Sequence, residues 1–122
     1  MRDDRVHLEY IVEAIQVVEE YLAGAAGTQN EPLFFGEALR RDAVLRRMET
    51  LADAAGQLSE PLKERHPALP WRRISDFRNI LAHAYTRVDL ELVWRVIVVN
   101  VPPLKALAIE ELARLSEPDG TA

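Results

Sequence analysis

Apolar residues recur every three or four positions along most of this 122-residue chain, which is the period of an amphipathic α-helix. The first stripe predicts a helix over residues 3–24, and the second predicts one over residues 36–57. A third helix is expected over about residues 70–86, and a fourth, with a long regular stripe, begins after Asp89. The glycines and the asparagine in residues 24–32 indicate a loop between the first two helices.

Capping residues and prolines mark where several of these helices begin or end. Ser59-Glu60-Pro61 is typical of a capped helix start, and it predicts a short helix that stops before Pro67. Asp89 is placed to cap the fourth helix. Pro102-Pro103 must kink or break that helix, because each proline lacks an amide proton and crowds the carbonyl four residues back.

No segment alternates between apolar and polar residues in the manner of a strand, and no internal repeat is visible. The expected fold is therefore all-α, an up-down four-helix bundle with one additional short helix. Its length predicts a single helical domain over residues 1–115, and residues 116–122 are expected to form a flexible tail.

Composition removes several functional classes. With no cysteine, the chain has no disulfide, thiolate nucleophile or cysteine-ligated zinc. His7 and His66 have no partner at metal-ligand spacing, and neither a glycine-rich phosphate loop nor a His-Glu-x-x-His pattern is present. We therefore expect no metal and no cofactor. The longest apolar run, Val96 to Val99, is far short of a membrane span, and with an N-terminus unlike a signal peptide this predicts a cytoplasmic protein.

The charge of the chain is unevenly distributed. Its net charge is −5, from 15 basic and 20 acidic residues, which as a whole opposes binding to nucleic acid. Residues 65–95, however, hold six arginines against three acidic residues, a net charge of +3. Either this segment contacts a specific polyanion, or the arginines are scattered unevenly by chance.

The third predicted helix carries the candidate chemistry. Drawn at 100° per residue, one narrow apolar arc faces the core, and its members are Phe77, Ile80, Leu81, Ala84 and Val88. Arg78 and Tyr85 lie on one flank, at roughly 80–100° from this arc. Asp76 and His83 lie on the other flank, at roughly 240–260°. Opposite the core is a strip of small side chains, which are Ser75, Asn79, Ala82 and Thr86.

Arginine and histidine are the residue types that metal-free phosphodiester chemistry requires. An imidazole exchanges protons near neutral pH, and a guanidinium stays charged and presents a planar fork to phosphate oxygens. Because Arg78 and His83 diverge by roughly 140°, with roughly 7.5 Å of rise between them, one helix does not easily aim both at the same phosphate. Two copies packed around a two-fold axis through the small strip would line a shared cleft with both groups.

Each of these residues also has a plainer interpretation. His83 is equally consistent with a surface or hydrogen-bonded structural histidine, and Arg78 with a solvated helix charge. Tyr85 is consistent with a packing aromatic whose hydroxyl reaches water. Asn79, one turn before His83, either orients the imidazole or only tolerates exposure.

The motif on this helix resembles a known signature, R-x4-H-x-Y of the HEPN superfamily. The residues that carry the resemblance are Arg78-Asn79-Ile80-Leu81-Ala82-His83-Ala84-Tyr85. The flanking blocks are similar to the HepT-like toxin branch, and they are Asp42-Ala43-Val44-Leu45-Arg46-Arg47, Pro70-Trp71-Arg72, Asp89-Leu90-Glu91-Leu92-Val93-Trp94 and Pro102-Pro103-Leu104-Lys105. The similarity covers about residues 40–105 strongly. Ala84 and Asp53 depart from the family, which often has glycine and glutamate there.

The resemblance implies a helical homodimer that acts as a metal-independent endoribonuclease, with its R-x4-H motifs meeting at the interface. It implies that His83 is the general acid and base, that Arg78 stabilises the phosphate, and that Asn79 is a supporting polar residue. The 2′-hydroxyl of the RNA would be the nucleophile. It further implies a toxin–antitoxin pair, in which an MntA-like nucleotidyltransferase antitoxin adds AMP to the motif tyrosine, here Tyr85.

Two other functions stay open at this point. One is a non-catalytic HEPN module that binds a nucleotide or serves as the helper subunit of a minimal nucleotidyltransferase. The other is a purely structural helical bundle, which leaves the spacing of Arg78, His83 and Tyr85 unexplained.

Overall fold

The fold is known from a computed structural model, which describes residues 2–23, 31–83 and 89–116 of the chain. All elements in the described residues are helices, as the sequence predicts. In chain order they are α1 (Arg2–Tyr21), α2 (Glu31–Gly36), α3 (Ala38–Gly56), α4 (Glu60–Arg65), α5 (Trp71–His83), α6 (Leu90–Arg95), the π-helix η3 (Val96–Asn100) and α7 (Val101–Ser116).

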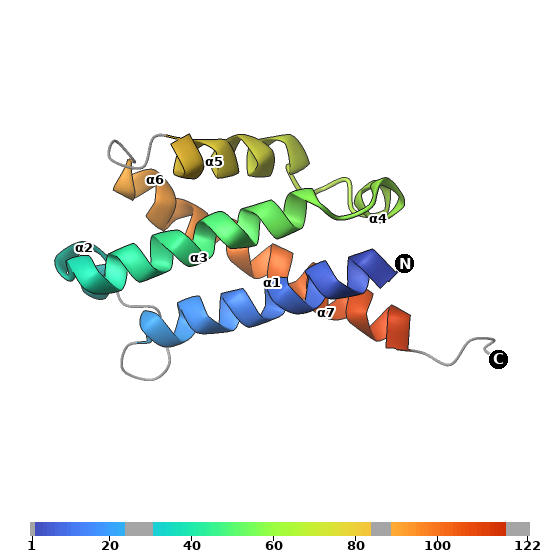
Figure 1. Ribbon diagram of the computed structural model, residues 1–122, viewed down its shortest axis with the longest axis horizontal. Coiled ribbons are helices and arrows are strands. Elements are labelled where there is room, and N and C mark those ends of the chain that lie inside the picture. Colours follow the sequence, from blue (N-terminus) through green and yellow to red (C-terminus); the bar gives the residue numbers. More distant parts are fainter. Residues whose placement is uncertain (1, 24–30, 84–88, 117–122) are drawn as a thin grey trace.

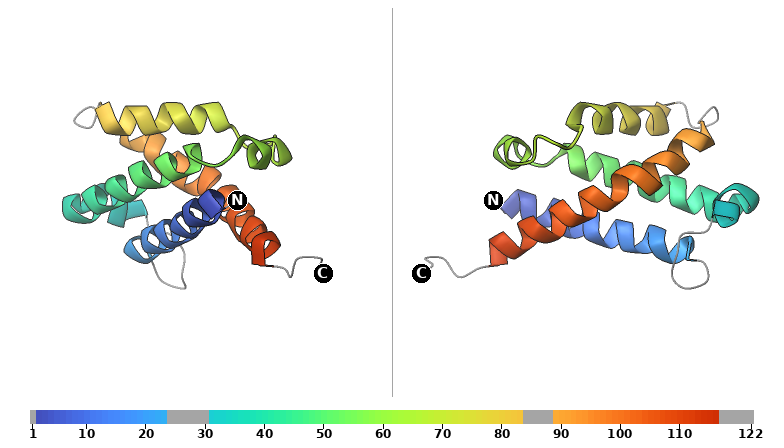
Figure 2. Two further views of the ribbon diagram at one scale, coloured as in Figure 1. Left: turned by 45° about the vertical axis from the view of Figure 1, so that its right-hand side comes forward. Right: turned by 180° about the vertical axis from the view of Figure 1, so that it is seen from behind.

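Three of the long helices run side by side, and the fourth crosses behind them. Figure 1 shows α3 between α1 and α5, each antiparallel to its neighbour. The segments α6, η3 and α7 form a continuous rod, which crosses behind the other three (Figure 2). The helix α5 packs mainly against α3 and therefore lies at one edge of the bundle. The candidate residues are thus carried by a helix with much of its surface uncovered.

The core is built from the stripes that the sequence predicts. The helix α1 buries its stripe completely at Leu8, Ile11 and Ile15. The helix α3 contributes a second buried stripe, and the rod contributes a third, so that the four long helices share one core. Burial of a large aliphatic side chain contributes about 1.5–3 kcal/mol, and this shared core is therefore what holds α3, the support of α5, in place.

The helix α2 is absent from the sequence-based prediction, which leaves residues 24–32 as a loop and starts the next helix at residue 36. Six residues are too few to show a helical period, and the hydrophobic signal is only the pair Phe34-Phe35. Tertiary packing stabilises this short helix, because Phe34 is fully buried and its ring centroid lies 5.7 Å from that of Trp94. The helix α2 therefore closes one end of the bundle, beside α6.

Both predicted helix caps are confirmed. The Ser59 hydroxyl accepts from the backbone N–H of Leu62 at 3.4 Å, at the start of α4. The Asp89 carboxylate accepts from the N–H groups of Glu91 and Leu92 at 3.0 and 3.2 Å, at the start of α6. Such caps satisfy amides that have no partner inside the helix and contribute about 1 kcal/mol each.

Pro102-Pro103 were expected to kink or break the last helix, and a break is contradicted by the structure. The rod continues from Leu90 to Ser116 and changes to a π-helix at Val96–Asn100, just before the two prolines. The N–H of Val101 donates to the Val96 carbonyl, five residues back. This wider turn accommodates the proline rings, which would crowd the carbonyls of Val98 and Val99 in a regular α-helix.

The rod Leu90–Ser116 is long and apolar enough to cross a membrane, by length and composition only. Core helices of soluble proteins meet the same criterion. Here its buried face, which includes Ile97, Leu104 and Ala108, packs in the core of the bundle.

The remaining predicted boundaries differ by a few residues from those observed. The first helix ends at Tyr21 and the second spans Ala38–Gly56. The predicted third helix reaches residue 86, whereas the described part of α5 ends at His83. Ser116, predicted to begin the tail, is the last residue of α7. Outside the described residues lie residues 84–86 of the third predicted helix, most of the predicted loop, and residues 117–122 of the predicted tail.

Candidate functional site

The helix α5 presents one buried face and a largely exposed remainder. Phe77 and Leu81 are buried against the core, as their positions in the sequence predict. Ile80 is 39% exposed, so its predicted place in the core is wrong. The reason is that α5 packs mainly on α3, and the side of α5 that carries Ile80 faces a groove. Ala84 and Val88, also predicted to face the core, lie outside the described residues.

Arg78 is held by two neighbours rather than extended into solvent. Its Nε lies 3.3 Å from Oδ1 of Asp53, which is on α3, and its Nη1 donates to Oδ1 of Asn79 at 3.2 Å. The side chain is still 41% exposed, and Nη2 donates to no described residue. Two of the three guanidinium nitrogens are thus held by described residues, which leaves Nη2 to donate to an anion.

Asp53 is the site residue whose role the sequence does not reveal. Its side chain, on α3, reaches Arg78 on α5. The two residues are 25 positions apart on different helices, so only the packing of α3 on α5 brings them together. With 48% of the Asp53 side chain exposed, the pair adds at most about 1 kcal/mol to stability. Its structural effect is to orient the guanidinium.

Among the described side chains, Asn79 contacts Arg78. Its carboxamide oxygen accepts from the guanidinium, and its side chain is exposed on the outer face of α5. Ser75 is also exposed there, and Ala82 is half-buried, which agrees with the predicted strip of small residues. Thr86, the fourth member of the strip, lies outside the described residues.

The helix α5 ends at His83 in the described part of the chain. The backbone of His83 is described but its side chain is not, and Tyr85 lies outside the described residues. The backbone of α5 is helical from Trp71 to His83, so positions 78 and 83 keep the spacing expected of a helix. That spacing is roughly 140° and roughly 7.5 Å, which places the two positions on different flanks. In a single chain, positions 78 and 83 of α5 therefore face in different directions.

A second group of polar residues lies at the far end of α7 and was not predicted as a site. The carboxylate of Glu111, a residue only 1% exposed, is bonded at 2.8 Å by Arg65 Nη2 and at 2.6 Å by His66 Nε2. Burial alone would raise the pKa of Glu111, but the hydrogen bonds from Arg65 and His66 outweigh it and hold the pKa below its ordinary value. The same hydrogen bond raises the pKa of Arg65. No local signal in the sequence links residues that are 45 positions apart.

This group can be compared with a metal centre. Ligand atoms of His66, Glu110 and Glu111 lie within 4.8 Å of one another. Arg65 binds Glu111 through both Nε and Nη2, however, and a guanidinium beside a cation would oppose its binding. The carbonyl of His66 also accepts from the indole N–H of Trp71 at 3.0 Å. The arrangement is that of an ion-pair clamp, which ties α7 and α4 to the beginning of α5.

Comparison with protein families identifies the chain by its sequence. A family model described as "Ribonuclease HepT-like" matches residues 11–111. The chain is 31% identical to the "Probable ribonuclease HepT" of Thermococcus cleftensis, over 85% of this chain and 91% of the relative. It is 25% identical to a "Putative RNase" of Caldanaerobacter subterraneus subsp. tengcongensis, over 93% and 98% of the two chains.

A longer relative is also similar over nearly the whole chain. A "Gamma-glutamylcyclotransferase and putative RNase" of Methanocaldococcus jannaschii is 33% identical over 95% of this chain. This chain spans about half of that relative, with 49% of its length covered. No solved structure gives a significant match. The resemblance inferred from the motif and its flanking blocks is therefore confirmed by independent comparison.

Proposed function

Because this chain belongs to the family of HepT-like ribonucleases, we propose that it is an endoribonuclease that cleaves RNA without a metal ion, with Arg78 and His83 as its catalytic residues. The observation that carries the proposal is the state of Arg78. Its guanidinium is anchored at Nε by Asp53 and at Nη1 by Asn79, while Nη2 donates to no described residue. Because its position is already fixed, the guanidinium can stabilise negative charge on a phosphate without a change in its own conformation.

The proposed reaction is an internal transesterification. The imidazole of His83 accepts the proton of a ribose 2′-hydroxyl, and the 2′-oxygen forms a bond to the adjacent phosphorus. The bond from phosphorus to the 5′-oxygen breaks, and that oxygen takes up a proton from a histidine. The products are a 2′,3′-cyclic phosphate and a 5′-hydroxyl, and no other reactant is consumed. Arg78 balances the negative charge of the pentacovalent intermediate.

We propose that the active site is built by a homodimer. Positions 78 and 83 lie on different flanks of α5, so an arginine and a histidine converge more easily from two copies than from one. The exposed Ser75 and Asn79 offer little steric obstacle to a second copy of the helix. A dimer also sets two copies of the +3 segment at residues 65–95 side by side, which offsets the net charge of −5 where RNA would bind.

We propose further that the enzyme is the toxin of a toxin–antitoxin pair, neutralised by an MntA-like nucleotidyltransferase that adds AMP to Tyr85. The proposal rests on the motif tyrosine and on its position, because residues 78 and 85 would share one flank if the helix continued. An added phosphate there would compete with RNA for the guanidinium. Intact-mass measurement after co-expression with such a partner should show one AMP per chain, which Tyr85→Phe should abolish.

The test of the nuclease proposal is RNA cleavage by the purified full-length chain in the presence of EDTA. We expect wild-type protein and His7→Ala, a control that loses a histidine outside the motif, to cleave RNA. Arg78→Ala and His83→Ala should lose cleavage by several orders of magnitude while remaining folded. Full cleavage by both variants would overturn the proposed site. Nucleotide or partner binding by a wild-type protein that leaves RNA intact would replace the proposal by the non-catalytic HEPN module.

A further inference from the structure

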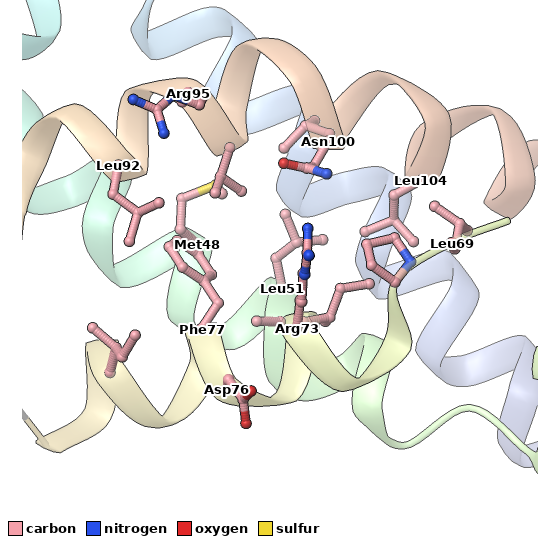
Figure 3. Close-up of a pocket in the computed structure, with 16 residues that line it drawn as sticks. Met48, Leu51, Leu69, Arg73, Asp76, Phe77, Leu92, Arg95, Asn100 and Leu104 are labelled. Atoms are coloured by element: carbon pink, nitrogen blue, oxygen red, sulfur yellow. The ribbon is translucent and has the colours of Figure 1, made fainter.

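An apolar groove lies along the side of α5 that faces α6 and η3. Its volume is about 360 Å³, which falls within the range of small-molecule sites in proteins. Figure 3 shows Phe77 of α5, Met48 and Leu51 of α3, and Leu92 and Leu104 of the rod directed into the space between these helices. Ile80 also lines the groove, and its 39% exposure shows that this side of α5 is uncovered.

Two arginines on opposite sides of the groove lack acidic partners among the described residues. Arg73 belongs to α5 and Arg95 to α6, and neither forms an ion pair or a side-chain hydrogen bond with any described residue. In Figure 3, Arg73 extends from α5 across the groove in the direction of Asn100. Asp76 also lines the groove, and its carboxylate forms no ion pair with Arg73 or Arg95. The groove therefore combines an apolar interior with two cations whose charge is not neutralised by the described fold.

The π-helix shapes one wall of this groove. Val96 and Asn100, its first and last residues, both line the groove, as does Val101 immediately after it. The extra residue in a π turn rotates the following side chains relative to a regular α-helix, and such turns are frequent at functional sites. Here the turn brings an amide side chain, with two donors and one acceptor oxygen, to an otherwise apolar wall.

We propose that this groove is a nucleotide subsite for the RNA substrate, which holds the base of a nucleotide adjacent to the cleaved linkage. The base packs against Ile80 and Phe77, its edge is within reach of Asn100, and its phosphate binds Arg73 and Arg95. Single-stranded RNA is recognised in this way, by apolar packing of splayed bases together with cations along the backbone.

The position of the groove supports this assignment, which rests on the proposed function. Position 83 lies three residues after Ile80 and roughly 60° around α5 from it, so the groove begins about 4.5 Å along the helix from the catalytic position. Charge complementarity favours RNA as the occupant, because each nucleotide brings one negatively charged phosphate and one base whose flat face packs on apolar side chains. A second copy of this chain carries a net charge of −5 over all of its residues but has no phosphate group.

Binding can be measured separately from cleavage with a single-stranded DNA oligonucleotide, which lacks the 2′-hydroxyl. The full-length chain is titrated against a labelled oligonucleotide, and fluorescence anisotropy gives the affinity as a function of salt. We expect Arg73→Ala/Arg95→Ala to weaken binding on the order of tenfold and to reduce the salt slope by about 0.7 for each phosphate that is no longer bound. Arg114→Ala is the matched control, because it removes an exposed arginine at the far end of α7 and should change affinity less than about twofold.

Ile80→Glu tests the base-packing part of the subsite, since a half-exposed residue tolerates the change without unfolding. It should weaken oligonucleotide binding and, in RNA cleavage, raise KM more than it lowers kcat. If the double arginine variant binds as tightly as Arg114→Ala, the subsite is refuted. If the loss of binding occurs only together with a change in sedimentation from dimer to monomer, the groove is an interface between copies and the proposal is also refuted. Weakened DNA binding by the groove variants, with no RNA cleavage by wild-type protein, would retain the subsite and refute the nuclease proposal.

Discussion

Glu111→Gln removes a charge from the interior of the bundle, and its effect on stability can be worked out from the contacts of that carboxylate. The residue is 1% exposed and is bonded by Arg65 and His66, with Arg114 3.9 Å away. Glutamine keeps one acceptor oxygen but removes the charge, so the guanidinium groups of Arg65 and Arg114 lose their counter-ion.

The expected decrease in the free energy of unfolding is moderate for a variant that breaks a buried ion pair. Breaking a fully buried pair by removing one partner is destabilising by about 3–5 kcal/mol. The side chain of Arg65 is 39% exposed here, and that of His66 is 17% exposed, so water replaces part of the lost interaction. We therefore expect a loss of about 2 kcal/mol at pH 7, which for a domain of this size lowers the Tm by about 6–10 °C.

The pH dependence provides the sharper test. The folded state lowers the pKa of Glu111, so its stabilisation is fully present above the ordinary value of 4.5 and is lost as the pH falls through the folded value. Urea unfolding followed by circular dichroism should show that the free energy of unfolding differs between wild type and Glu111→Gln by a constant amount from pH 8 to pH 5. This difference should then narrow steadily on further acidification.

Glu110→Gln is the matched control, because it removes the same charge from the neighbouring exposed residue. It should change the free energy of unfolding by less than about 0.5 kcal/mol. The assignment of Glu111, Arg65 and His66 as an ion-pair clamp would be refuted by either of two results. One is that Glu111→Gln has the same free energy of unfolding as wild type at pH 7, and the other is that the difference between them is as large at pH 3 as at pH 7.

Three further substitutions test individual parts of the fold and site. Phe34→Ala should lower the free energy of unfolding in urea by about 3–4 kcal/mol, because the ring is fully buried beneath Trp94. Asp89→Ala should lower it by about 1 kcal/mol through loss of the α6 cap, and Asp89→Asn, which retains the acceptor oxygen, should restore most of that. Asp53→Asn should change stability by less than about 1 kcal/mol, since the ion pair is half-exposed, while kcat for RNA cleavage falls several-fold because Arg78 loses its anchor. An unchanged kcat would show that Asp53 does not position the guanidinium.

The fold was largely predictable because its main signals are local. Helix stripes follow from spacing along the chain, and the caps at Ser59 and Asp89 require only the residues next to them. The helix α2 was not predictable, since its stability comes from Phe34 packing in the core rather than from a period. The sequence did indicate a disturbance at Pro102-Pro103, but whether a helix kinks, breaks or widens into a π turn depends on how its neighbours hold it.

The candidate site also combines features that the sequence shows with features that depend on how the helices pack. Arg78 and its motif are contiguous in sequence and were found there, but its anchor on Asp53 depends on how α3 packs on α5. Ile80 was assigned to the core from its angle on the helix, although an angle cannot show that a groove lies on that side. The partner of His66 is Glu111, which is 45 residues away in sequence and is brought to it by the position of α7.

The central proposal is that Arg78 and His83 act together across a dimer, and mixing two inactive variants tests it most directly. Arg78→Ala and His83→Ala proteins are each purified, combined in equal amounts, allowed to exchange subunits, and assayed for RNA cleavage in EDTA. A site built from both subunits keeps one intact arginine–histidine pair in each mixed dimer, so activity should recover to about a quarter of the wild-type level. A mixture that stays as inactive as its components, although mass spectrometry shows that mixed dimers have formed, would contradict the proposal.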